Sequence, residues 1–308
     1  MGRRCYPDNP RVHLLIPFAA PLADAGRAAL ASLELPRLRA FLQRAETAAR
    51  DPGDEWSYSP PHERALALAL GYAGGDGELP WAAHLARADG IDPGDLAWGL
   101  LTPVHWLLGT EQVSLMDPAA LALDEAASRT LFEAAKPLFE SEGFVLAWGA
   151  PLRWYAAHES FAALRTASPD RVIGRNVDRW LVGGAQARLV RRLQNEVQML
   201  FHTHPLNAER EARGLLPVNS FWLSGCGRAQ APGGAAPTVD ERLRGPAFAE
   251  DWAAWCKAWD VVDAAVASAT RVTLCGERSS VTLVPGGGWS RLTSMLRAPR
   301  PAALLETL

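Results

Sequence analysis

The chain has 308 residues and a formal net charge of −3, and 48% of its residues are hydrophobic. This length and composition suffice for two ordinary domains with filled cores. The mild acidity predicts no nucleic-acid partner, and the apolar runs are too short to predict a membrane partner. Four cysteines without Cys-x-x-Cys spacing predict neither a zinc site nor a disulfide framework, so the cytoplasm is the expected location.

The first third of the chain predicts one strand followed by helices. Val12 to Phe18 is short and apolar, which is typical of a buried strand. Leu30 to Ala49 has helical spacing, with a break between Leu33 and Pro36. Further helices are expected from Glu63 to Tyr72 and from Trp81 to Ala88.

The middle of the chain alternates between strand and helix patterns. Leu100 to Leu108 predicts a strand that continues to Val113–Leu115. A helix is expected from Glu125 to Glu140, because Asp124 and Glu125 place two carboxylates at its start, where they suit the positive end of a helix. Phe144 to Trp148 and Leu152 to Ala156 read as a hairpin. Strands that alternate with helices favour an α/β fold.

The last third begins with a Gly- and Pro-rich segment from Arg228 to Pro246, which predicts a linker. Strands are expected at Arg271–Cys275 and Ser280–Val284. The three glycines at 286–288 and the tail from Arg297 predict mobile segments.

Tryptophan recurs at helical spacing in the segment Phe248 to Ser268, at Trp252, Trp255 and Trp259. Such spacing favours a buried stripe on a helix, in which each indole needs a partner for its N–H. An aromatic ligand platform is the alternative.

The densest group of polar and turn-forming residues follows a helix expected at Gln186–His202, which ends because Pro205 disfavours helical geometry before it. Asn207 is placed to cap a short helix from Ala208 to Arg213, which Gly214 can close. After Pro217, a strand from Val218 to Leu223 and a tight turn at Gly225-Cys226-Gly227 complete the segment. We call residues 202–227 the motif run.

The motif run offers several chemical interpretations. Its amides and arginine, together with Asn195 and Gln198 on the preceding helix, suit a polar pocket; capping, solvation and strand-edge contacts are the alternative. His202, His204 and Cys226 form a weak metal candidate, because a His-x-His pair converges poorly and a fourth ligand is not evident. Cys226 is either an exposed reactive thiol or an inert small residue.

The motif run resembles a motif of the archaeal-type cofactor-independent phosphoglycerate mutases, which belong to the alkaline phosphatase superfamily. The matching residues stand in fixed order: His204-Pro205-Leu206-Asn207, Arg210, Gly214, Pro217-Val218-Asn219, Trp222 and Gly225-Cys226-Gly227. The whole chain is similar to the RpfE-type bacterial regulatory proteins, through the segments His13–Ala19 and Leu274–Arg278.

The resemblance implies an α/β fold with an inserted domain. An alkaline-phosphatase-like core is expected from both chain ends, residues 1–96 and 231–308. Residues 97–230 are expected to form the inserted α+β domain that carries the motif.

The superfamily also holds two divalent metals, and here the sequence departs from it. The first metal carboxylate of the superfamily follows the first strand, where this chain has Pro17-Phe18-Ala19-Ala20-Pro21 and no carboxylate before Asp24. The superfamily motif Gly-Asp-His-Ser corresponds to Gly276-Glu277-Arg278-Ser279. Arginine keeps its proton and has no lone pair for a metal. We therefore expect degenerate metal positions at Glu277 and Arg278, with no bound metal and no cofactor.

Three functions follow as hypotheses. The first is a catalytically degenerate phosphoglycerate-mutase-like protein that binds a phosphorylated small molecule or a protein partner and has a regulatory role. The second is an active phosphomutase or phosphatase with rearranged or metal-independent chemistry, and the third is a structural interaction partner. Arg278 either pairs with Glu277 or holds an anion. The candidate ligand-binding residues are His204, Asn207, Arg210, Asn219, Trp222, Gly225, Gly227 and Arg278.

Overall fold

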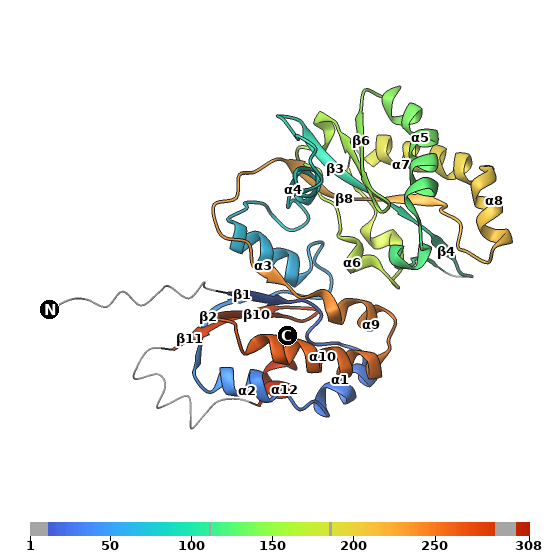
Figure 1. The fold of residues 1–308 in the computed structure, drawn as a ribbon. Coiled ribbons are helices and arrows are strands. Elements are labelled where there is room, and N and C mark those ends of the chain that lie inside the picture. The colour runs from blue at the N-terminus through green and yellow to red at the C-terminus, as the bar shows by residue number, and fades with distance from the viewer. Residues whose placement is uncertain (1–11, 111, 185–186, 287–299) are drawn as a thin grey trace. The chain divides into compact units, whose positions relative to one another are not determined.

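The structure is a computed structural model that describes residues 12–110, 112–184, 187–286 and 300–308 (Figure 1). The chain divides into two compact units. Unit 1 comprises Met1–Glu55, Pro60–Gly71 and Gly233–Leu308, and unit 2 comprises Trp56–Ser59 and Tyr72–Pro232. Unit 1 therefore draws on segments that are far apart in the sequence.

The division differs from the expected start of the insertion at residue 97, because residues 72–96 lie in unit 2. The helix α4 (Trp81–Ala88) explains the difference. Its alanines pack in one cluster with Trp98 and Tyr155, which stand on strands of unit 2. A helix with buried contacts of this kind belongs to the core that it covers.

Unit 1 contains a five-stranded mixed sheet with the strand order β2-β11-β10-β1-β9. Its strands are β1 (His13–Ile16), β2 (Ala45–Asp51), β9 (Thr238–Val239), β10 (Arg271–Cys275) and β11 (Ser280–Pro285). Its helices are α1 (Asp24–Ala31), α2 (Pro36–Leu42), α3 (Pro61–Leu70), α9 (Arg244–Phe248), α10 (Trp252–Val266) and α12 (Pro301–Leu305). Because β1 runs parallel to β9 and β10, the carboxyl ends of these three strands lie at the same end of the sheet.

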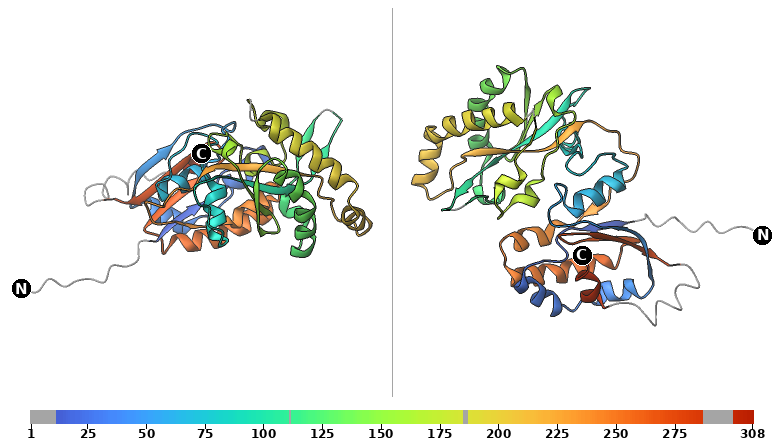
Figure 2. Two further views of the ribbon diagram at one scale, coloured as in Figure 1. Left: turned by 90° about the horizontal axis from the view of Figure 1, so that it is seen from above. Right: turned by 180° about the vertical axis from the view of Figure 1, so that it is seen from behind.

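Helices cover both faces of the unit 1 sheet (Figures 1 and 2). Successive residues of β1 face opposite sides, as strand geometry requires. Leu14 and Ile16 join a core cluster with α2 and α10, whereas Leu15 packs with Ala65 of α3. Both sides of β1 are therefore buried, which explains the apolar run Leu14-Leu15-Ile16 after His13.

The tryptophan stripe is part of this core. Trp255 and Trp259 of α10 are fully buried, and Trp252 packs against the same cluster. The indole N–H of Trp255 donates to the main-chain oxygen of Phe18 at 3.1 Å. The predicted burial of the stripe is thus confirmed, but the expected partner for each indole N–H is not, because the Nε1 of Trp259 is buried without a hydrogen-bond partner.

One expectation for unit 1 is wrong in part and another is wrong. The helical pattern expected from Leu30 to Ala49 is confirmed for α2 after the predicted break, but its end forms the strand β2. The sequence of β2, Ala-Glu-Thr-Ala-Ala-Arg-Asp, lacks apolar alternation because the strand forms an edge of the sheet. The tail expected to be mobile forms α12 over Pro301–Leu305 and packs into the core, and Leu305 is fully buried. Gly287, Gly288 and residues 297–299 lie outside the described residues.

Unit 2 contains a four-stranded antiparallel sheet with the order β6-β7-β3-β8, and a separate β4-β5 hairpin. The strands are β3 (Ala97–Val104), β4 (Trp106–Leu108), β5 (Val113–Leu115), β6 (Val145–Ala150), β7 (Arg153–Ala157) and β8 (Ser220–Arg228). The helices besides α4 are α5 (Glu125–Glu140), α6 (Pro169–Val172), α7 (Ala187–His202) and α8 (Pro205–Ala212). The predictions of α4, α5 and the β6-β7 hairpin are confirmed.

Helices pack on unit 2's sheet from two sides. Residues of α5 and α7 share a core cluster with Leu101, Trp154 and Phe221 of the strands. The alanines of α4 contact the sheet in a second cluster, with Trp98 and Leu100. Within the described part of the chain, none of the helices has the length and apolar character needed to cross a membrane.

Candidate functional site

The motif run forms the end of α7, the helix α8 and the strand β8. His204 is the N-cap of α8, and its Nδ1 accepts a hydrogen bond from the main-chain N–H of Leu206 at 3.2 Å. The predicted cap at Asn207 is therefore wrong, because α8 already begins at Pro205, a residue that suits the first helical position. Gly214 closes the helix with a φ of +70°, as predicted.

Asn207 joins three main-chain groups inside unit 2. Its amide nitrogen donates to the carbonyl oxygens of Phe201 at 2.8 Å and Val218 at 2.7 Å. Its side-chain oxygen accepts from the N–H of Val218 at 2.9 Å. The side chain is buried and fixes the segment before β8 onto the end of α7.

Arg210 is also directed at the main chain. Its Nε donates to the oxygen of Leu216 at 3.0 Å, and an Nη donates to the oxygen of Leu121. The residue is 2% exposed, so the alternative that it is solvated is wrong. Burial lowers the pKa of the Arg210 guanidinium, although Asp124 opposes the shift. These hydrogen bonds fix the loop after α8 to the segment that contains Leu121.

Asn219 and Trp222 have internal partners as well. The Asn219 side chain accepts from the N–H of Trp106 at 2.7 Å and donates to its oxygen at 2.9 Å. The buried Trp222 donates to the oxygen of Ala167 at 2.8 Å. Asn195 is exposed on α7, whereas Asn207 is buried, so the contacts do not support the expected polar pocket. Ligand binding by the motif run stays a prediction.

Gly225 and Gly227 lie within β8 rather than in the predicted turn. The β3-β8 register shifts beside Gly225 and Gly227, which have φ values of +62° and +151°. A Cβ atom on Gly225 would lie 2.9 Å from the nitrogen of Ala82 and 2.9 Å from Cβ of Trp81. The irregularity therefore allows the start of α4 to approach the strand, as bulges with glycine commonly do.

Cys226 stands between these two glycines and points into the core. It is 2% exposed, and burial raises the pKa of its thiol. A protonated, buried thiol is a poor nucleophile. The reactive-thiol alternative is therefore wrong, and Cys226 is a small core residue.

Gly225→Ala is expected to lower the free energy of unfolding by about 2 kcal/mol, because an L-residue is strained at this φ and contacts α4. Urea denaturation measures the loss. Gly214→Ala is the matched control: its φ is also positive, but nothing lies within 4 Å of its Cβ position. Equal losses in the two variants would show that the approach of α4 does not require Gly225.

The second candidate site lies in unit 1, at the carboxyl ends of β1 and β10. The chain leaves β1 through Phe18, which has a φ of +55°, and the N–H of Ala19 donates to the oxygen of Cys275 at 2.8 Å. It leaves β10 through a turn closed by a 3.0 Å hydrogen bond from Gly276 N–H to the oxygen of Ser279. The two segments that carry metal ligands in the resembled superfamily are thus adjacent. Ligands of open α/β sheets commonly bind at such strand ends.

Glu277 and Arg278 have separate partners in this turn. Glu277 accepts a hydrogen bond from the N–H of Leu22 at 2.8 Å, and Arg278 Nε donates to a carboxylate oxygen of Glu55 at 3.0 Å. The interpretation of Glu277 and Arg278 as a mutual ion pair is replaced by these contacts. The main-chain N–H of Glu55 and the nearby Arg278 lower the pKa of the Glu55 carboxyl group.

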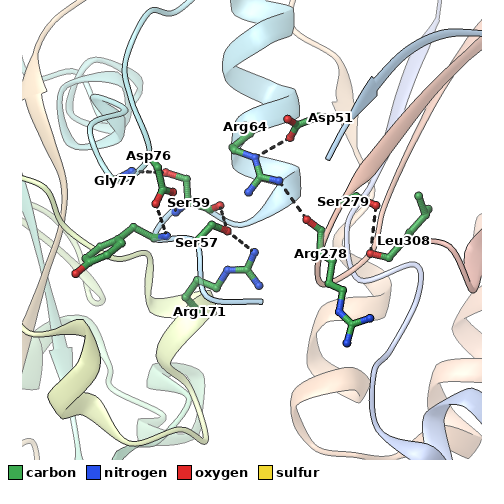
Figure 3. Close-up of polar contacts among 11 residues, drawn as sticks. Asp51, Ser57, Ser59, Arg64, Asp76, Gly77, Arg171, Arg278, Ser279 and Leu308 are labelled. Atoms are coloured by element: carbon green, nitrogen blue, oxygen red, sulfur yellow. Dashed lines mark hydrogen bonds and ion pairs between the residues drawn. The ribbon is translucent and has the colours of Figure 1, made fainter. Parts of the chain in front are cut away.

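Arg64 of α3 supports the turn from its other side. Its Nε lies 2.6 Å from a carboxylate oxygen of Asp51, and its Nη2 donates to the main-chain oxygen of Arg278 at 3.3 Å. Figure 3 shows the guanidinium group of Arg278 directed away from Arg64. The sequence did not mark Asp51, Glu55 or Arg64, because they stand on different elements and share no spacing.

A hollow of about 320 Å³ adjoins the turn within unit 1, and we call it the strand-end hollow. Two exposed arginines, Arg27 of α1 and Arg278, contribute to its lining. Glu306 contributes a side-chain carboxylate to the lining. The full lining is Ala20, Pro21, Leu22, Arg27, Leu30, Arg278, Leu305, Glu306, Thr307 and Leu308.

One main-chain oxygen receives several donors beside this hollow. The oxygen of Leu308 accepts from the N–H of Arg278 at 3.0 Å and from the N–H of Ser279 at 2.9 Å. The hydroxyl group of Ser279 lies 3.4 Å from the same oxygen (Figure 3). Successive N–H groups that converge in this way are typical of anion-binding turns.

The residues at the strand ends do not fit a two-metal centre. The segment after β1 has no carboxylate until the exposed Asp24, and Arg278 offers no lone pair. Among the residues that the structure describes, no group of three or more His, Cys, Asp or Glu side chains converges to hold a metal ion. Two-metal sites need several such ligands.

A comparison with protein-family models found no match, and neither did one with curated proteins. A cofactor-independent phosphoglycerate mutase from Thermoplasma acidophilum DSM 1728 is similar in structure, with 15% identity over 97% of this chain and 98% of that chain and a TM-score of 0.36. The PH0037 protein from Pyrococcus horikoshii has 13% identity over 90% of this chain and 88% of that chain, with a TM-score of 0.43. Likeness at this level assigns no activity, and membership of the RpfE-type group stays a prediction.

Proposed function

We propose that the protein is a catalytically degenerate, phosphoglycerate-mutase-like protein that binds a small anion in the strand-end hollow and has a regulatory role. The observation that carries the proposal is the presence of two arginines, Arg27 and Arg278, in the lining of one hollow. Arginine keeps its charge at all physiological pH values and offers several donors to a phosphate group.

The neighbourhood of Arg278 supports an anion rather than a cation as ligand. Main-chain N–H groups of Arg278 and Ser279 already converge on an oxygen beside the hollow. The ion pair with Glu55 is partly exposed, since 46% of the Arg278 side chain remains accessible. Exposed pairs contribute little stability, so a doubly charged anion can compete for the guanidinium group.

We propose that catalysis is lost because the residues at two expected metal positions cannot bind a metal ion. The position that resembles a metal-binding histidine carries Arg278, and the turn after β1 lacks a carboxylate. A positively charged side chain at this point repels divalent cations and attracts the phosphate group that such cations would otherwise hold. An arginine in place of the histidine therefore disfavours metal binding and favours anion binding at this position.

Arg278→Ala is expected to weaken the binding of inorganic phosphate about tenfold, because a charge-assisted hydrogen bond is worth roughly 1.5 kcal/mol or more. Calorimetric titration of the full chain measures the change, with 3-phosphoglycerate as a second probe. Arg271→Ala is the matched control, because it also removes an arginine, but at the start of β10 rather than in the turn that follows its end. Unchanged phosphate affinity in Arg278→Ala would contradict the proposed site.

The catalytic part of the proposal is tested separately. Interconversion of 2- and 3-phosphoglycerate is measured with and without added Mn²⁺, together with the metal content of the purified protein. We expect no turnover above background. Two tightly held divalent ions per chain, with activity that chelation removes, would overturn the degenerate assignment and leave anion binding to be judged by the titration.

A further inference from the structure

The last described segment of unit 1 packs against the strand-end hollow. Residues 301–308, which we call the plug segment, begin with α12 and continue to Leu308. Leu305 is fully buried and Leu308 is 3% exposed, and both join the core cluster that contains β10 and α10. Residues Leu305 to Leu308 also form part of the hollow's lining. The plug segment is therefore both a core element and a wall of the candidate site.

The plug segment uses the donors that an anion would need. The N–H groups of Arg278 and Ser279 point at the oxygen of Leu308 at 3.0 and 2.9 Å. The Ser279 hydroxyl group lies 3.3 Å from the oxygen of Thr307 and 3.4 Å from that of Leu308. An N–H group makes one good hydrogen bond at a time, so an anion oxygen and Leu308 cannot both occupy this position.

We propose that the plug segment is a built-in competitor of the anion: phosphate binds fully in the strand-end hollow only when Leu308 leaves the turn of Arg278 and Ser279. The inference rests on the proposed function and adds its regulation. The apparent affinity for the anion is reduced by the fraction of molecules in which the plug is docked. Any partner that holds the plug segment away from the turn raises that affinity.

Gly276 provides a way to displace the plug without removing a charge or a donor. A Cβ atom on Gly276 would lie 2.5 Å from the carbonyl carbon of Leu308, 2.7 Å from its Cβ and 2.8 Å from its oxygen. Gly276 is not among the glycines with positive φ, so alanine fits the backbone there. Gly276→Ala should therefore push Leu308 away and leave Arg278 and Ser279 in place.

The test is a calorimetric titration of inorganic phosphate into the full chain. Gly276→Ala is expected to bind phosphate about three- to tenfold more tightly than the parent, because the docked fraction no longer reduces the affinity. Gly245→Ala is the matched control, because nothing lies within 4 Å of its Cβ position in α9 of the same unit. It should bind like the parent.

A second variant covers the case in which Gly276→Ala does not fold by circular dichroism. Leu308→Ala removes most of the buried side chain that docks the plug, and the affinity should rise in the same direction. Equal or weaker phosphate binding in the folded variants, with clear binding by the parent, would overturn the competitor role and leave the proposed function standing. If phosphate binds neither to the parent nor to Gly276→Ala and Leu308→Ala, the proposed function itself is overturned, and the competitor role with it.

Discussion

Asn207→Ala is expected to lower the free energy of unfolding by about 3 kcal/mol, as measured by urea denaturation. The oxygen and the N–H of Val218 both lose their partner, and the oxygen of Phe201 loses one of two donors, because it keeps the N–H of His204 at 3.2 Å. The site is only 5% exposed, so water does not readily replace the amide. Each buried polar group left without a partner costs about 1–3 kcal/mol.

The control for this prediction is Asn195→Ala, an amide on the exposed side of α7. Substitutions at exposed positions of this kind change stability by less than about 0.5 kcal/mol.

The same two variants also test whether the motif run binds a ligand or stabilises the fold. If folded Asn207→Ala keeps the stability of the parent but loses phosphate binding, the ligand-binding interpretation of the motif run is right and the structural interpretation is wrong.

Asp89→Ala is expected to cost about 3 kcal/mol, because it breaks a network at the end of α4. Arg153 donates to both carboxylate oxygens of Asp89, at 2.9 and 2.8 Å, and the hydroxyl group of Tyr155 donates at 2.6 Å. Tyr155 is fully buried, so its hydroxyl group is left without this acceptor in the variant. Asp95→Ala, at an exposed position between α4 and β3, is the control.

The network also predicts a dependence on pH. Hydrogen bonds from Arg153 and Tyr155 lower the pKa of Asp89, whereas partial burial opposes the shift. A depressed pKa means that the ionised carboxylate stabilises the fold above its ordinary pKa near 3.8, and that this contribution is lost as the pH falls further. Asp89→Ala should therefore differ most from the parent at neutral pH and least in strong acid. A constant difference across this range would contradict the role of the charge.

Local patterns were sufficient to predict several elements of the fold. The helix α5 has an N-cap aspartate, an acidic start and regular apolar spacing, and the β6-β7 hairpin has two short apolar runs around a turn. The edge strand β2 has no such pattern, because its pairing with β11 depends on residues more than two hundred positions later. Its assignment requires the assembled sheet.

The candidate sites show a different limit of sequence reasoning. The motif run was recognisable because polar and turn residues are dense there, yet Asn207 and Arg210 are buried and bind main-chain groups. Density of polar residues does not distinguish a ligand pocket from a buried network. The strand-end hollow combines residues of α1, the turn after β10 and the plug segment, and only Arg278 was expected from a motif.

The parallel pairing of β1 with β10 also has a consequence for the order of folding. His13 pairs with Arg271, so the central strand pair of unit 1 joins residues separated by most of the chain. Residues 72–232 of unit 2 are synthesised entirely within that interval. At about 5–20 residues per second, a ribosome needs roughly 13 to 50 seconds between these two strands. Unit 2 therefore has time to fold before β10, the inner neighbour of the apolar β1, has been synthesised.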